Sequence, residues 1–110
     1  MPTVITASAS ISVSVPLPYS TVTSPLAARG QARVFEGNLR VAVLGSAGQV
    51  LGEHSLTASV GAPQWGSFAG EIAFRPPERE EAGAVRFFSL SPRDGSIQEA
   101  ITIPVRLRPR

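Results

Sequence analysis

Apolar and polar residues alternate along most of this chain, and this period of two constrains its fold more than any other feature. Residues 97–107 show it most clearly, because five aliphatic residues there share one parity: Ile97, Ile101, Ile103, Val105 and Leu107. Successive side chains of a β-strand point to opposite faces, so the alternation predicts a strand with one buried face. No segment shows a helical pattern, and we therefore expect an all-β protein.

Six further segments have strand patterns between turn-forming residues: 11–15, 26–34, 39–44, 49–59, 68–74 and 84–90. The turn signals include Ser46-Ala47-Gly48 and the Asp94-Gly95 pair. Seven strands at this spacing predict an immunoglobulin-like, two-sheet antiparallel β-sandwich, because a closed up-and-down barrel usually has an even number of strands. The chain has no cysteine, so we expect a sandwich without a disulfide.

The length of 110 residues corresponds to one domain. Residues 1–10 are small and polar and predict a flexible lead-in, whereas residues 11–110 are expected to form the sandwich. Residues 32–52, two strand-like runs around a glycine-containing turn, are the expected seed of the fold. Pro16 and Pro18 favour an edge position for the first strand, because proline cannot donate to a ladder. Residues 19–25 are expected to form a loop.

The composition narrows the classes of partner. All ten basic residues are arginine, yet the net charge is only +2, and a nucleic-acid-binding domain usually carries a denser basic patch. No stretch approaches the roughly 20 apolar residues that cross a bilayer. The start of the chain also lacks the apolar run of a signal peptide. We therefore expect no nucleic-acid partner and no transmembrane segment.

Three segments carry a family resemblance: residues 32–53, 61–74 and 90–107. Their motifs are Val34-Phe35-Glu36, Trp65-Gly66-Ser67-Phe68, Asp94-Gly95-Ser96 and Ile103-Pro104-Val105. Over about residues 11–108 the chain resembles the immunoglobulin-like domain of bacterial spore germination. The resemblance implies an extracytoplasmic module of bacterial envelope proteins and lipoproteins, with no catalytic residues to carry over. The chain departs from the usual pattern because it has no lipobox cysteine and no partner domain.

The reactive side chains do not form a recognisable set. His54 is the only histidine, and a zinc site needs three or four ligands, so an ordinary strand side chain is the preferred interpretation. A triad of His54, Asp94 and a serine is disfavoured, because Asp94 belongs to a turn and the chain has no nucleophile elbow. We therefore expect no enzyme activity, no cofactor and no metal.

Three other features allow two interpretations each. Glu36 is expected to fasten a corner with its carboxylate, alone or paired with Arg33 or Arg86. Trp65 is either an exposed platform for a sugar ring or a cap on the end of the core, and the cap is preferred. The acidic residues Glu78, Glu80 and Glu81 could suggest a calcium loop, but the spacing typical of calcium ligands is missing and a solvated loop is preferred.

Several arginines have outward parity on their predicted strands: Arg29, Arg33, Arg40, Arg106, Arg108 and Arg110. If these strands are neighbours, they form a basic stripe for an anionic wall polymer, lipid headgroups or an acidic partner. If they are not, the arginines belong to an ordinary solvated sheet face. The candidate ligand or partner surface consists of Trp65, Arg106, Arg108, Arg29 and Arg33.

The leading hypothesis is a non-catalytic interaction or spacer module of a bacterial cell-envelope protein, for example one associated with sporulation or germination. The alternative is a module that binds glycan or wall polymer through Trp65 and exposed arginines. A third hypothesis is weak self-association of a monomer through an edge strand, either the first strand or the last. The expected partner is a protein or a cell-wall polymer. An envelope location requires that the natural chain carry a signal; otherwise a cytoplasmic location is compatible with the sequence.

Overall fold

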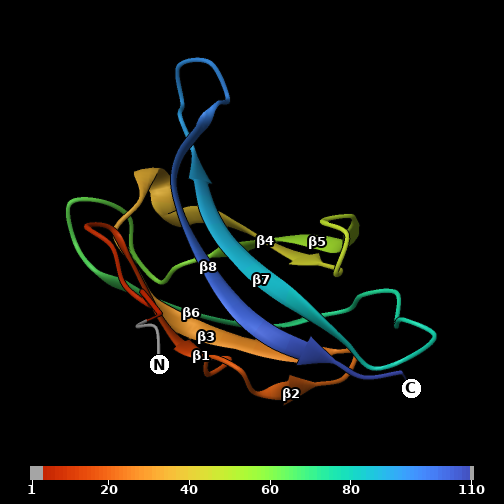
Figure 1. The fold of residues 1–110 in the computed structure, drawn as a ribbon. Helices are drawn as coiled ribbons and strands as arrows, with labels where there is room; N and C mark the ends of the chain where they lie inside the picture. Colours follow the sequence, from red (N-terminus) through yellow and green to blue (C-terminus); the bar gives the residue numbers. More distant parts are fainter. Residues whose placement is uncertain (1–3, 110) are drawn as a thin grey trace.

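The computed structural model describes residues 4–109 and confirms an all-β architecture of two sheets (Figure 1). The described residues form eight strands and one short 3₁₀ turn, η1 (Phe35–Gly37), which precedes the fourth strand. The strands are β1 (Ile11–Val15), β2 (Thr21–Val22), β3 (Leu26–Ala32), β4 (Asn38–Leu44), β5 (Val50–Thr57), β6 (Gly66–Ile72), β7 (Glu81–Leu90) and β8 (Ile97–Leu107).

The strands divide into a three-stranded sheet, in the order β1-β3-β6, and a five-stranded sheet, in the order β2-β8-β7-β4-β5. Neighbouring strands are antiparallel, except that β2 runs parallel to β8. The seven predicted strands are confirmed, with ends that shift by a few residues. The additional strand is β2, which lies in the predicted loop 19–25 and is too short to show alternation.

The core lies between the sheets and consists mainly of inward-facing residues of β1, β3, β4, β6, β7 and β8, with Leu51 and Leu56 of β5 packed against it and only partly buried. Phe68 of β6 and Phe87 of β7 meet across the sandwich, with ring centroids 5.8 Å apart. The small residues predicted on β3 make room for this contact. A Cβ atom on Gly30 would lie 2.7 Å from Cζ of Phe68 and 2.1 Å from the Ser12 carbonyl oxygen, so glycine alone fits there.

Pro104 lies inside β8 without breaking the sheet. Its carbonyl oxygen accepts a hydrogen bond from the Tyr19 N–H at 2.7 Å, so the polar backbone atoms of Pro104 face the β2 side of the strand. The paired part of β2 begins only at Thr21, opposite Arg106. The missing N–H of the proline therefore faces a position that has no strand partner, as the edge preference of proline requires.

The predicted flexible lead-in is partly built into the domain, and residues 1–3 of it lie outside the described residues. The carbonyl oxygen of Thr6 accepts a hydrogen bond from the Val13 N–H at 2.8 Å, and Ala7 forms a bridge with Ser12. The Ser10 N–H donates to the Glu99 carboxylate of β8 at 2.8 Å. Residues 6–10 thus cover the free edge of β1.

The strand order confirms that β1 is an outer strand, as its prolines predicted, and corrects the prediction about the last strand. β8 is not an edge, because it lies between β2 and β7. Residues 6–8 pair with the outer side of β1. Self-association through β8 therefore has no free ladder to use, and residues 6–8 occupy part of the ladder that β1 would offer.

The corner before β4 is held by backbone groups. The carbonyl oxygen of Val34 accepts hydrogen bonds from the N–H groups of Gly37 and Ala62, each at 2.9 Å. Glu36 adopts φ 53°, in the left-handed region, and its side chain is exposed. Within the described residues its carboxylate has no hydrogen bond and no ion pair, so the prediction that this carboxylate fastens the corner is wrong.

The two phenylalanines that differ most in burial provide a test of the core. Phe87 is fully buried, whereas Phe35 is 57% exposed. We expect Phe87→Ala to lower the free energy of unfolding by about 3–5 kcal/mol, because it leaves a cavity between the sheets. Phe35→Ala is the matched control and should change it by less than about 0.5 kcal/mol. Urea unfolding followed by far-UV circular dichroism measures both, and equal effects would contradict this assignment of the core.

Candidate interaction surfaces

The predicted basic stripe does not form, because its arginines lie in different sheets. Arg29 belongs to β3 and Arg33 follows that strand, so both lie on the three-stranded sheet. Arg40, Arg106 and Arg108 belong to strands β4 and β8, or directly follow them, in the five-stranded sheet. The sixth predicted member, Arg110, lies outside the described residues.

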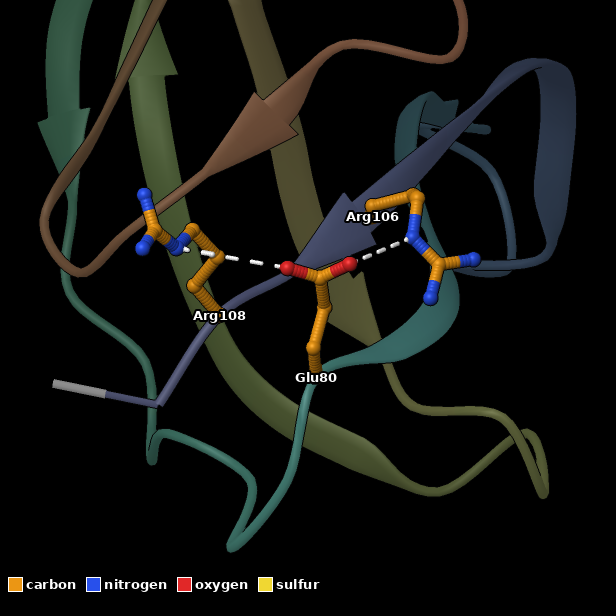
Figure 2. A network of polar contacts seen from close by, with 3 residues as sticks. All are labelled: Glu80, Arg106 and Arg108. Atoms are coloured by element: carbon orange, nitrogen blue, oxygen red, sulfur yellow. Dashed lines mark hydrogen bonds and ion pairs between the residues drawn. The ribbon is translucent and has the colours of Figure 1, made fainter.

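Three arginines of the five-stranded sheet, Arg40, Arg106 and Arg108, are paired with carboxylates. Figure 2 shows Glu80 between Arg106 and Arg108, with Nε of Arg106 2.9 Å and Nε of Arg108 4.0 Å from the two carboxylate oxygens. Nη1 of Arg40 lies 3.1 Å from Glu53. These pairs are exposed, so each contributes little to stability. Their main consequence is that Glu53 and Glu80 offset part of the positive charge of these three arginines.

The acidic side chains of Glu80 and Glu81, where the connection meets β7, do not point toward a common site. Glu80 faces the two arginines, whereas the carboxylate of Glu81 accepts a hydrogen bond from the Ser46 N–H at 2.7 Å. Among the described residues no group of three or more histidine, cysteine or acidic side chains is arranged to hold a metal. These two carboxylates therefore serve different structural contacts.

Trp65 lies at the surface, with 42% of its area exposed, so the preferred prediction of a core cap is wrong. Cζ of Arg33 stands 5.1 Å from the centroid of the indole ring, in cation–π geometry. Nε of Arg33 also donates a hydrogen bond to the Ala9 carbonyl oxygen at 2.9 Å. A cation–π contact at an exposed site contributes about 0.5–1 kcal/mol. The two contacts give the indole a defined orientation, and its exposed surface is available to a ligand.

Exposed apolar groups also gather at the end of the sandwich where Trp65 lies. This loop end consists of residues 6–10, 33–37, 58–65 and 91–96, and Figure 1 shows η1, the β5–β6 loop and the long β7–β8 hairpin there. Phe35 borders a hollow of about 580 Å³ between the corner, β4 and the hairpin. A second hollow, between the N-terminal segment and the hairpin, is lined by Arg33, Phe35 and Pro92 among others.

The residues weighed for catalysis lie on separate elements and have structural partners. His54 is on the edge strand β5, and its Nε2 lies 3.2 Å from the Ala73 carbonyl oxygen. Asp94 lies in the β7–β8 turn, where its carboxylate accepts hydrogen bonds from the Ser96 N–H at 3.0 Å and the Ser96 hydroxyl at 2.7 Å. These bonds, the backbone one first, hold the pKa of the Asp94 carboxyl below its ordinary value of 3.8.

The Asp94 turn gives a pH-dependent prediction. Because the folded-state pKa is lowered, the carboxylate stabilises the turn above the ordinary value, and this contribution is lost as the pH falls through the folded-state pKa. A ¹³C NMR titration of the carboxyl group, which belongs to the only aspartate of the chain, should have its midpoint below 3.8. Ser96→Ala should raise the midpoint, whereas Ser14→Ala on β1 should leave it unchanged. A wild-type midpoint at or above 3.8 would contradict the turn geometry.

Comparison with known protein families gives a match for this chain. The family described as the immunoglobulin-like domain of bacterial spore germination matches residues 10–96, which is most of the chain. No curated protein and no solved structure matches. No helix among residues 4–109 has the length and apolar character to span a membrane. The sandwich of two sheets and the match over residues 10–96 agree, and the chain therefore belongs to the family of immunoglobulin-like domains of bacterial spore germination.

Proposed function

We propose that this domain is a non-catalytic binding module of a bacterial cell-envelope protein, and that Trp65 with Arg33 forms the centre of its binding surface. The observation that carries the proposal is the exposed indole, which Arg33 holds at the loop end. Tryptophan and arginine are the residue types most enriched among the side chains that dominate binding energy.

Solvation explains why this surface is favoured over the others. Leaving a large aromatic side chain in water forgoes the free energy of burying it, and a partner that covers the ring recovers that free energy. The guanidinium beside the ring adds a charge and several hydrogen-bond donors in a fixed orientation. On the five-stranded sheet, by contrast, Arg106 and Arg108 share the carboxylate of Glu80, so they offer a partner less free charge.

The envelope location is part of the proposal, and its support is the family resemblance. Modules of this kind resemble extracytoplasmic domains of envelope proteins, so the partner is a protein or a polymer of the cell wall. The location would require that the natural chain be exported. Fold alone does not select a partner, because β-sandwiches serve many unrelated functions.

The proposal also separates a binding module from a spacer. A spacer needs only a stable fold, and its exposed aromatic side chains could be truncated without consequence. A binding module depends on the particular aromatic residue that its partner covers. Tyr19 offers a matched control, because it is 52% exposed and lies between β1 and β2, outside the loop end.

The test is capture of material from a bacterial envelope extract by the immobilised domain. We expect Trp65→Ala to reduce the amount captured at least about fivefold, because truncation of a central aromatic residue costs more than about 1 kcal/mol. Tyr19→Ala should capture as much as the wild type. Equal capture by the wild type and the Trp65 variant would contradict the proposal and would favour a spacer.

A further inference from the structure

We infer that the outer face of the three-stranded sheet, beside Trp65, is a binding site for an acidic oligosaccharide. This inference rests on the proposed function, because it uses Trp65 as part of a binding surface. It adds the location of the site, the residues that line it and the chemical class of the ligand.

The register of the three strands arranges polar side chains in rows across this face. Ser12 of β1 pairs with Gln31 of β3, which pairs in turn with Ser67 of β6, so a hydroxyl, an amide and a hydroxyl stand side by side. On the next outward position of β3, Arg29 pairs with Ala69. In the other direction, Arg33 and Trp65 flank the last pair of the ladder, Ala32 with Gly66.

Most of the outward side chains on this face are short. They are alanine or serine at Ser12, Ser14, Ala27, Ser67 and Ala69, where a solvated sheet face commonly carries long charged side chains. Short side chains leave a flat surface, above which the longer Gln31, Arg29 and Trp65 project. A flat polar surface with one aromatic side chain at its end suits a chain of sugar rings, whose C–H faces can lie on an indole while their hydroxyls meet polar groups.

A shallow hollow of about 380 Å³ marks where a ring would sit. It is lined by Ala7, Ser8, Ser12, Gln31 and Trp65. The N-terminal segment forms one wall of the hollow, because residues 6–8 pair with β1. A sugar ring in this hollow would touch the indole on one side and reach the amide of Gln31 and the hydroxyl of Ser12 on the other.

The charge of the face selects an acidic sugar. The ion pairs of the described residues involve Arg40, Arg106 and Arg108, so Arg29 and Arg33 keep their positive charge free of a carboxylate. Glu71 lies opposite Ala27, toward the other end of β3, and the carboxylate of Glu99 is bound by the Ser8 hydroxyl and the Ser10 N–H. Arg29 lies two residues from Gln31 on β3 and Arg33 lies over the Trp65 ring, and both would pair with a ligand carboxylate through charge-assisted hydrogen bonds.

The test compares two tetrasaccharides that share their backbone and differ in charge. One alternates N-acetylglucosamine with N-acetylmuramic acid, which carries a carboxylate, and the other is the neutral chitotetraose. Each is titrated into the ¹⁵N-labelled domain and followed by NMR. We expect the acidic tetrasaccharide to shift the indole N–H of Trp65 and the backbone amides of Ser12, Gln31 and Ser67, and to bind more weakly as salt is raised.

The variants separate the parts of the site. Trp65→Ala should weaken binding of the acidic tetrasaccharide at least about fivefold. Arg29→Gln should weaken it about two- to fivefold, and should leave binding of the neutral one unchanged. Arg93→Gln removes an exposed arginine of the β7–β8 turn and should have no effect. Because Arg29 lies on an exposed face, its variant keeps the test valid even if the tryptophan variant fails to fold.

Three results would overturn the inference. The first is that neither tetrasaccharide shifts the Trp65 resonance. The second is equal affinity for the two sugars with no effect of Arg29→Gln, which would remove the acidic specificity. The third is a set of shifts centred on the amides of Phe35 and Ser91, which would move the site to the hairpin. If the sugars fail while capture from envelope extract still depends on Trp65, the proposed function stands and its ligand is a protein or a different wall polymer.

Discussion

The contact between Phe68 and Phe87 is the interaction on which the arrangement of this domain depends. It joins an outer strand of one sheet to the central strand of the other, and it uses the space that Gly30 leaves open. In antibody domains a disulfide performs this task. Here apolar burial alone does so, because the chain has no cysteine. With Phe68 directed inward, strand alternation directs Ser67 and Ala69 outward, so the core also determines which residues form the polar face.

Most of the fold could be predicted because alternation reports directly which face of a strand is buried. The inward parity of residues 97–107 and the small inner face of β3 are both found in the structure. The alternation of apolar and polar residues does not report which segments contact one another. The two residues of β2 are ordered by pairing with β8, and residues 6–10 are held by β1 and Glu99, so neither carries a periodic signal of its own.

The candidate surfaces were less predictable for the same reason. Parity correctly directed Arg29 and Arg33 outward, but it did not say that β3 and β8 belong to different sheets, and the predicted stripe depended on that. Trp65 lies in a loop, where no periodicity distinguishes a cap from an exposed side chain. Its position depends on Arg33, which is 32 residues away in sequence and is brought close by the pairing of β3 with β6. For Glu36, the sequence predicted that a side chain holds the corner. The corner is instead held by backbone hydrogen bonds and by the left-handed conformation of Glu36 and Gly37.

The position of the single tryptophan has a spectroscopic consequence. The aromatic residues of the core are phenylalanines, namely Phe68, Phe74 and Phe87, and the indole lies outside it. Intrinsic emission excited at the red edge of protein absorption therefore arises from the candidate site. Ligand binding can be followed by indole emission and unfolding by ellipticity, since indole emission follows this surface and ellipticity follows the strands.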